Sequence, residues 1–273
     1  MRVAIIGGAG KMGQWFTKFF LDQNASVIVT GRTQEKLLKV KRKFGVEITD
    51  NINAVKKADR VLVCVPIETF EDVVKEIHSH VKPNQVIMDI CSIKEFPVKI
   101  MQKYITKATT LGTHPMFGPS AKSIKDQNFI LTPTNPREEQ FANEFKTWLE
   151  KRKAKVTIMQ PRKHDEMMSI VLGLSHFVGM VACDTLLSGS DYAETIKISG
   201  STFKLLSMLA ETVASQDPDF YATLQMTLPS VEKNERLFYE KAGDWMDMVR
   251  RKDKSMLIEK AKSIKTKLEK VNP

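Results

Sequence analysis

The chain has 273 residues, which is long enough for one large domain or two ordinary ones. Hydrophobic residues make up 42% of it and charged residues 27%, a composition that predicts a soluble globular protein. Its three cysteines are widely spaced, which excludes a disulfide framework and a cysteine-based zinc motif. The formal net charge of +10 indicates a lysine-rich solvated surface or an anionic ligand, and the lysine-rich stretches at 36–43 and 251–270 lack the interleaved aromatic residues of a single-strand nucleic-acid binder.

The sequence also bears on the location of the protein. We find no apolar run that comes near the roughly 18 residues a membrane-spanning helix needs. The amino terminus runs from Met1 directly into a strand-like segment, without the apolar region and cleavage site of a signal peptide. We therefore expect a cytoplasmic protein with neither a membrane nor a nucleic acid as partner.

The first half of the chain alternates short β-branched runs with amphipathic segments. Helices are predicted after residue 13, over 34–44 and over 69–80. Strands are predicted at 3–6, 27–29, 60–65 and 86–90, with shorter ones at Leu111 and 129–131. This alternation is typical of an α/β fold with a doubly wound parallel sheet.

Strand signals fade near residue 160, and long helical runs follow. Apolar residues recur at helical spacing around 167–178 and 205–213, and again along the tail from 244 to 271. We therefore predict two domains, a dinucleotide-binding domain over 1–160 and an all-helical domain over 161–273. By analogy, a helical domain appended in this way would form a homodimer.

A glycine signature lies between the first strand and the first helix. In this context Gly8 permits a tight turn, Gly10 lets the backbone approach a pyrophosphate, and Gly13 lets helix and strand pack closely. The helix N-terminus then offers free N–H groups and its positive dipole end to the phosphates. The sequence thus predicts a Rossmann domain whose cofactor lies along Gly8, Ala9, Gly10, Lys11, Met12 and Gly13.

The residues that follow the next two strands indicate which cofactor binds and where its nicotinamide lies. An NAD enzyme usually has an acidic residue about 20 residues past the glycines, but here the sequence is Gly31-Arg32-Thr33. Arg32 can pair with a 2′-phosphate and Thr33 can donate a hydrogen bond, so NADP is predicted over NAD. The alternative is that Arg32 stacks on adenine and both cofactors bind. Val65 and Pro66 are predicted to shape the loop beneath the nicotinamide ribose, although a proline that merely ends a strand explains them equally well.

The segment 112–119, with the sequence GTHPMFGP, places His114 on a loop that two prolines and two glycines stiffen. Histidine is the side chain whose ordinary pKa lies nearest neutrality. Ser92 and Lys94 follow the preceding strand, and both segments should lie at the same edge of the sheet. The combination predicts a positioned proton acceptor beside a redox cofactor.

With these motifs the chain resembles the prephenate and arogenate dehydrogenases of tyrosine biosynthesis, most closely the compact archaeal type. The family transfers a hydride from ring C4 of the substrate to the nicotinamide, while the ring carboxylate leaves as CO2 and the ring becomes aromatic. The resemblance implies that His114 accepts the proton of the 4-hydroxyl and that Ser92 helps to orient both groups. The matching elements are the glycine signature, Cys91-Ser92-Ile93-Lys94, the segment 112–119, His164-Asp165, Ser175-His176 and Asp217-Pro218.

The resemblance also implies substrate-binding residues in the helical domain. His176 matches a family histidine near the nicotinamide and substrate pocket, with a core or capping histidine as the alternative. Lys204 is in register with a family lysine and is the predicted partner of a substrate carboxylate, unless it is simply solvated. Gln225 would reach a substrate from the partner subunit, although dimer packing explains its segment equally well. His164 is interpreted as a helix-starting residue, with Asp165 in the first turn.

Two departures from the family pattern leave the substrate undecided. Many bacterial relatives carry a second histidine that helps to select the substrate side chain, where this chain has Gly179. They also carry an arginine that binds a carboxylate, where this chain has Met208, or Thr212 in a shifted alignment. A dicarboxylate substrate is therefore predicted without a choice between prephenate and arogenate. We expect no fused chorismate mutase, because both halves of the chain are assigned.

Two other functions share the two-domain plan. One is a reductase of β-hydroxy acids or imines; the former would need a catalytic lysine at the start of the second domain, where Lys163 is a poor match, and it would leave the His114 segment unexplained. The other is a non-enzymatic NADP-sensing module, which would bind the cofactor without turnover. No metal is expected, because no spacing of histidine and cysteine suggests a site.

Overall fold

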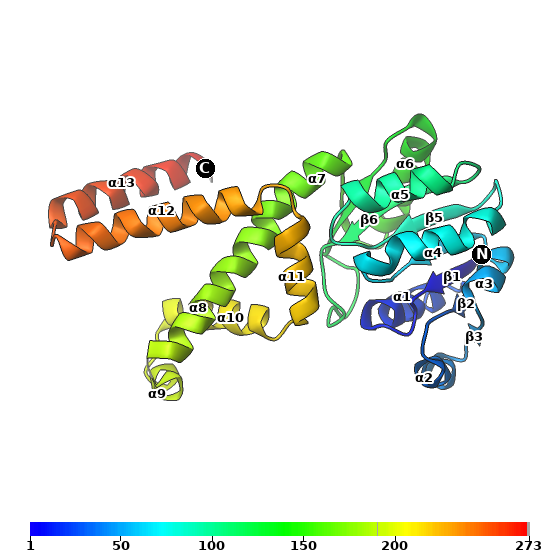
Figure 1. Ribbon diagram of the computed structural model, residues 1–273, viewed down its shortest axis with the longest axis horizontal. Coiled ribbons are helices and arrows are strands. Elements are labelled where there is room, and N and C mark those ends of the chain that lie inside the picture. Colours follow the sequence, from blue (N-terminus) through cyan, green and yellow to red (C-terminus); the bar gives the residue numbers. More distant parts are fainter. Residues whose placement is uncertain (190, 272–273) are drawn as a thin grey trace. The chain divides into compact units, whose positions relative to one another are not determined.

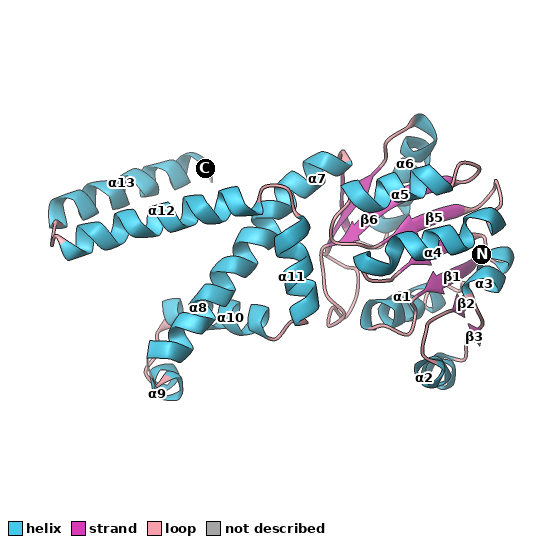
Figure 2. Cartoon of the chain, viewed as in Figure 1, coloured by secondary structure: helices cyan, strands magenta, loops and turns pink. Residues whose placement is uncertain are grey.

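The computed structural model describes residues 1–189 and 191–271, which belong to two units, Met1–Met167 and Met168–Pro273. The first unit is an α/β domain and the second is helical (Figures 1 and 2). The predicted fold class is therefore confirmed.

The first unit contains an eight-stranded sheet with the order β3-β2-β1-β4-β5-β6-β7-β8. Its first six strands are parallel, in the 3-2-1-4-5-6 order that is typical of dinucleotide-binding domains. The strands are β1 (Arg2–Ile6), β2 (Ser26–Val29), β3 (Glu47–Ile48), β4 (Arg60–Val63), β5 (Val86–Asp89), β6 (Thr109–Pro115), β7 (Asn128–Thr132) and β8 (Lys155–Ile158).

The parallel arrangement predicted for the sheet holds from β3 to β6 and ends there. β7 runs antiparallel to β6, and β8 runs parallel to β7. The connection from β6 to β7 contains no helix. A parallel neighbour would need a crossover, usually a helix, whereas an antiparallel neighbour does not.

Helices cover both faces of the sheet (Figure 1). Neighbouring residues of one strand point to opposite faces, so that Ile5 packs into one core and Ile6 into the other. This double burial explains why the strands read as nearly continuous apolar runs. One face carries α1 (Lys11–Leu21), α2 (Gln34–Phe44) and α6 (Pro136–Glu150). The other carries α3 (Asn51–Lys57), η1 (Ile67–Thr69), α4 (Phe70–Ile77), η2 (His78–His80) and α5 (Glu95–Tyr104).

The second unit consists of helices, and α8 and α10 pack closely within it. A Cβ on Gly179 would lie 2.8 Å from the Val213 side chain, so the two helices approach closely there. The tail is two helices rather than one continuous run, because the chain turns after Arg250, with Lys252 at a φ of 54°. The helices are α7 (Pro161–Met168), which spans the boundary between the units, the π-helix η3 (Ser169–Leu174), α8 (Ser175–Gly189), α9 (Tyr192–Lys197), α10 (Ser201–Ala214), α11 (Pro218–Thr227), α12 (Val231–Arg250) and α13 (Lys254–Val271).

One helical stretch is longer and more apolar than was predicted from the sequence. The helix Pro161–Gly189 contains an 18-residue window of mean hydropathy 1.8, of which only 11% is buried within the chain. By length and composition it could cross a membrane, which corrects the statement that no apolar run is long enough. A single helix of this kind is weak evidence for a membrane protein, because a core helix of a soluble protein and a signal sequence meet the same criteria of length and composition.

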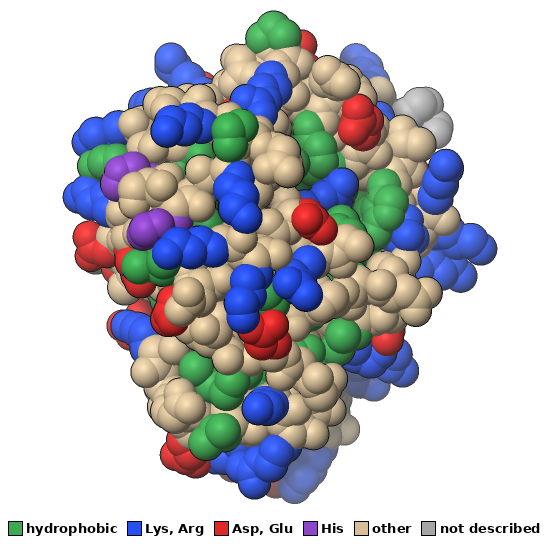
Figure 3. All heavy atoms as spheres, turned by 90° about the vertical axis from the view of Figure 1, so that its right-hand side faces the viewer, with side chains coloured by type: hydrophobic (Ala, Val, Ile, Leu, Met, Phe, Trp, Pro, Cys, Tyr) green, Lys and Arg blue, Asp and Glu red, His purple; other side chains and the backbone are tan. Residues whose placement is uncertain are grey.

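The positive charge is spread over the surface. Figure 3 shows lysine and arginine side chains scattered over one face of the molecule, with acidic and hydrophobic side chains between them. Several lysines of the protein pair with a carboxylate one helical turn away, such as Lys39 with Glu35 at 2.6 Å and Lys99 with Glu95 at 2.8 Å. This distribution is typical of a solvated basic surface.

Candidate active site

The carboxyl ends of β1, β2, β4, β5 and β6 meet along one edge of the sheet, because these strands are parallel neighbours. The glycine turn follows β1, Gly31 follows β2 closely, and Val65 follows β4. Ser92 follows β5, and His114 lies near the carboxyl end of β6. The structure therefore brings the predicted residues of the first unit to one edge, where open α/β sheets bind their ligands.

The glycine turn includes one glycine more than its signature, Gly7. Gly7, the residue before the Gly8 to which the tight turn was assigned, adopts the left-handed conformation, with a φ of +77°. Gly8 is needed for packing, because a Cβ there would lie 2.7 Å from the Val29 side chain. A Cβ on Gly13 would lie 2.5 Å from the Cα of Gly8, so only glycine lets α1 lie this close to the turn.

The start of α1 is open towards a ligand. Gly10 precedes the helix without a side-chain cap, and the first turn of α1 contains no acidic residue. A Cβ on Gly31 would lie 3.3 Å from Ala9, so the end of β2 lies against the glycine turn. Arg32 and Thr33 follow with exposed side chains. Uncapped N–H groups beside an exposed guanidinium fit the phosphates of a dinucleotide.

We expect Gly13→Ala to lower dinucleotide affinity by about tenfold or more, because the new Cβ would press α1 away from the turn and misplace its N–H groups. Isothermal titration with NADP measures this loss. The matched control is Gly243→Ala in α12, where a Cβ would meet nothing within 4 Å. Wild-type affinity in the Gly13 variant would contradict the close-packing role.

His114 is a strand residue, which corrects the prediction that it lies on a loop. It pairs with Ile130 of β7, and it is 5% exposed. Burial lowers the pKa of its imidazole well below the ordinary value, and the neighbouring His164 and Lys94 lower it further. His114 is therefore neutral near neutral pH, the state in which it can accept a proton.

The His114 ring forms a hydrogen bond with a residue for which another role was predicted. His114 Nδ1 lies 2.8 Å from Nε2 of His164, which is fully buried on α7. His164 Nδ1 lies 2.7 Å from Asp165 Oδ1. His164 is thus not merely a helix-starting residue, because the fold connects it to the predicted proton acceptor fifty positions earlier.

Asp165 connects this chain of hydrogen bonds to the start of α5. Its carboxylate accepts the backbone N–H of Lys94 at 2.7 Å and that of Glu95 at 2.9 Å. It therefore caps α5 from a different helix, and the positive end of the α5 dipole favours its negative charge. These bonds also explain why residues 161–167 lie with the first unit, although the predicted domain boundary followed residue 160.

A buried ion pair binds the backbone next to His114. Asp89 and Lys94 are both fully buried, and Lys94 Nζ donates to Asp89 Oδ2 and, at 2.6 Å, to the carbonyl oxygen of Thr113. Asp89 also accepts the backbone N–H of Cys91 at 2.8 Å and that of Thr113 at 3.3 Å. The pair thus ties the end of β5 to the residue before His114.

The neighbouring thiols are unsuited to proton transfer. Burial raises the pKa of the Cys64 and Cys91 thiols, and the charge of Asp89 raises both further. Ser92 lies half-buried in the loop between β5 and α5, directly after Cys91. At this edge of the sheet, His114 is thus better suited to accept a proton than either thiol.

The predicted substrate residues lie in the second unit. His176 of α8 is 9% exposed, burial lowers its pKa, and its Nδ1 has no hydrogen-bond partner within the described residues. Gln225 of α11 donates from Nε2 to the carbonyl oxygen of Gly173 at 3.0 Å, while its Oε1 is buried and unpaired in the same part of the chain. Lys204 of α10 is exposed. His176 and Gln225 thus each present a buried polar atom that a ligand could satisfy.

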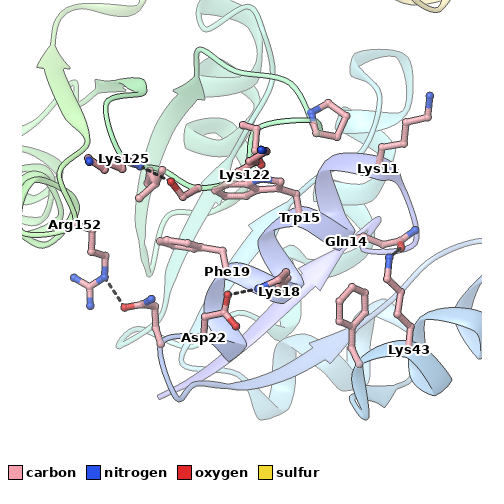
Figure 4. Close-up of a pocket in the computed structure, with 16 residues that line it drawn as sticks. Lys11, Gln14, Trp15, Lys18, Phe19, Asp22, Lys43, Lys122, Lys125 and Arg152 are labelled. Atoms are coloured by element: carbon pink, nitrogen blue, oxygen red, sulfur yellow. Dashed lines mark hydrogen bonds and ion pairs between the residues drawn. The ribbon is translucent and has the colours of Figure 1, made fainter.

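A basic groove of about 750 Å³ lies elsewhere on the first unit, along α1 (Figure 4). Trp15 and Phe19 lie among its cations, and Trp15 Nε1 donates to the Ala121 carbonyl at 2.7 Å. Of the predicted site residues only Lys11 lines it, so the groove shares the start of α1 with the predicted cofactor site but does not include His114. Its cations are Lys11, Lys18, Lys43, Lys122, Lys125 and Arg152.

Comparison with known proteins agrees with this architecture. Residues 18–158 match the family model "Prephenate dehydrogenase, nucleotide-binding domain", and residues 160–263 match "Prephenate dehydrogenase, dimerization domain". The chain is 37% identical over 258 residues to a probable arogenate/prephenate dehydrogenase of Methanocaldococcus jannaschii. The matched region covers 93% of this chain but only 58% of that relative.

Solved structures share the fold at low sequence identity. A prephenate dehydrogenase from A. aeolicus, in complex with hydroxyphenyl propionate and NAD+, has a TM-score of 0.81 at 23% identity, over 99% of this chain and 98% of that one. The arogenate dehydrogenase of Synechocystis has a TM-score of 0.77 at 15% identity, over 99% of this chain and 100% of that one. Because the two family models together match most of its length, the chain belongs to the prephenate dehydrogenase family.

Proposed function

We propose that this protein catalyses the oxidative decarboxylation of prephenate to 4-hydroxyphenylpyruvate, or of arogenate to tyrosine, with a nicotinamide cofactor. The observation that carries the proposal is a buried, neutral His114 at the same sheet edge as an uncapped glycine turn. Membership of the prephenate dehydrogenase family supports the reaction class.

The protein's part in this reaction is to position the substrate and to handle one proton. When bound, the nicotinamide accepts the hydride that leaves ring C4. His114 accepts the proton of the 4-hydroxyl as that carbon is oxidised, and Ser92 orients the hydroxyl and the imidazole. Loss of CO2 leaves an electron pair that makes the ring aromatic, and the proton returns to the phenolic oxygen. No net proton is released, so His114 holds the proton only transiently.

The remainder of the substrate carries carboxylate and side-chain groups that need partners. We propose that His176 and Gln225 bind these groups, because each has a buried polar atom without a partner among the described residues. Lys204 is proposed as the cation that pairs with a carboxylate, a role its exposed ammonium group is free to take. A side chain larger than glycine at position 179 would collide with Val213, so a second histidine would not fit there without repacking.

Incubating the protein with NADP and prephenate, and then with arogenate, tests the function. Absorbance of the reduced cofactor should rise with at least one substrate, and the faster of the two identifies the preferred side chain. Cofactor binding without turnover on either substrate would overturn the proposal and favour the sensing module.

We also propose that NADP is preferred over NAD, because Arg32 is exposed where NAD enzymes usually carry a carboxylate. Arg32→Asp is expected to lower kcat/KM with NADP by about 10- to 100-fold, since a charge-assisted hydrogen bond is worth roughly 1.5–3 kcal/mol. The efficiency with NAD should change little or rise. Arg42→Ala on α2, whose guanidinium donates to the Leu38 carbonyl, is the matched control. A clear NAD preference in the unmodified protein would contradict the assignment.

A homodimer formed through the helical domain is proposed as the working assembly. The second unit matches a dimerization domain and leaves large apolar side chains exposed, for example Leu205 at 67% and Met208 at 63%. A second copy of the chain would cover such surfaces, including the apolar helix Pro161–Gly189. Sedimentation at twice the chain mass of 31.0 kDa tests the dimer. A cytoplasmic location stays a prediction.

A further inference from the structure

Three buried groups form a continuous hydrogen-bonded chain that starts at His114. His114 Nδ1 faces His164 Nε2 at 2.8 Å, and His164 Nδ1 faces Asp165 Oδ1 at 2.7 Å. His114, His164 and Asp165 are 5%, 0% and 4% exposed, so water does not compete for these bonds. Each of the two hydrogen bonds therefore needs one donor and one acceptor among these three side chains.

The proton positions follow from the Asp165 end. Asp165 accepts two backbone N–H groups at the start of α5, so its oxygens serve as acceptors. His164 must then carry its proton on Nδ1 to donate to the carboxylate. A neutral imidazole has only one N–H, so His164 Nε2 is an acceptor. The proton of His114 consequently lies on Nδ1, and its Nε2 has a free lone pair.

We propose that His164, held by Asp165, is a positioning residue that fixes His114 as the Nδ1–H tautomer and so leaves Nε2 as its proton-accepting atom. In the opposite tautomer His114 Nε2 would already carry a proton and could not take the one on the 4-hydroxyl. The consequence for turnover rests on the proposed function, whereas the tautomer itself does not.

The same chain of bonds stabilises His114 after it has taken the proton. The imidazolium can donate from Nδ1 to His164, whose own Nδ1–H is directed at the negative Asp165. The other charged groups around the pair are Lys94 and Asp89, which form a fully buried ion pair; Lys94 lowers the pKa of both histidines, and Asp89 raises that of His164. Asp165 is thus the negative group at the end of this hydrogen-bonded series, where its charge would stabilise a transient imidazolium at His114.

Nuclear magnetic resonance tests the tautomer without any substrate. In protein labelled with nitrogen-15 at histidine, the ring signals of His114 and His164 are assigned from the spectra of His114→Gln and His164→Gln. Both residues should be neutral and protonated at Nδ1 near neutral pH. Protonation of His114 at Nε2 would overturn the inference, whether or not the protein has dehydrogenase activity.

Two substitutions at position 164 test the role in turnover. His164→Leu fills a similar volume but offers no acceptor, and it should lower kcat by about 100-fold or more, with little change in KM or NADP affinity. In His164→Gln the amide oxygen can accept from His114 Nδ1–H, so kcat should recover to within about tenfold of wild type. His80→Leu, at a half-buried position in η2 outside the candidate site, is the matched control and should behave as wild type.

The outcomes separate this inference from the proposed function. Equal kcat values for His164→Leu and wild type, or equal losses in the leucine and glutamine variants, would overturn the positioning role. If the leucine variant does not fold, a kcat of His164→Gln more than about 100-fold below wild type would also overturn it. If wild type oxidises neither prephenate nor arogenate, the proposed function fails, and the resonance experiment still decides the tautomer.

Discussion

His114→Ala is expected to retain NADP binding and to lose turnover by about 10²- to 10⁴-fold, the usual contribution of a general base. The imidazole is neutral because burial lowers its pKa, and it lies at the sheet edge that carries the cofactor turn. Its removal leaves the 4-hydroxyl proton without an acceptor at that position. Steady-state kcat and isothermal titration with NADP measure the two properties separately.

The alanine variant also removes the partner of His164 Nε2, so a loss of stability has to be distinguished from a loss of chemistry. An unsatisfied buried polar group costs roughly 1–3 kcal/mol, which urea unfolding would detect. His114→Gln retains a side chain that can hydrogen-bond and should unfold closer to wild type, yet remain slow. His80→Ala, at a half-buried position outside the candidate site, should stay close to wild type in both assays. Near-normal turnover in either His114 variant would refute its role as proton acceptor.

Lys94→Met is expected to lower the free energy of unfolding by about 3–5 kcal/mol, because it leaves the buried Asp89 without its cation. Two backbone N–H groups remain as partners of Asp89, but they do not neutralise its charge. Turnover should fall as well, since Lys94 Nζ also binds the carbonyl of Thr113, next to His114. Urea unfolding monitored by circular dichroism measures the change.

The matched control is Lys99→Met, which breaks an exposed ion pair with Glu95 in α5. Exposed pairs contribute about 0–1 kcal/mol, so this variant should unfold close to wild type. The double substitution Lys94→Met with Asp89→Asn removes both charges and should recover part of the lost stability. Equal effects of Lys94→Met and Lys99→Met would show that the buried pair does not hold the end of β5.

Local patterns were enough to predict much of the first unit. The helix over residues 34–44 and the strands near residues 3, 27, 60 and 86 were predicted close to their observed positions, because propensity and apolar periodicity act over a few residues. The short β3 and α3, as well as α5, α6 and β8, were not predicted. β3 has two residues and α3 has seven, too few for a clear period.

The glycine turn after β1 shows what a sequence motif does not predict. The spacing of Gly8, Gly10 and Gly13 was sufficient to indicate a dinucleotide site. It did not show that Gly7 has a φ of +77°, or that a Cβ there would lie 2.5 Å from the carbonyl oxygen of Cys64. The second requirement arises only in the assembled sheet, where the segments that follow β1 and β4 come close together.

The sequence by itself determined the family, the two-domain order and the prediction of His114 as proton acceptor, since each rests on short motifs or on local periodicity that can be read without knowing which segments meet in space. Only the tertiary structure decided that His114 belongs to a strand, that β7 runs antiparallel to it, and that His164 and Asp165 complete its hydrogen bonds. The physical reason is that a buried imidazole must find its partners in space, and here the partner lies on a helix fifty residues further along the chain.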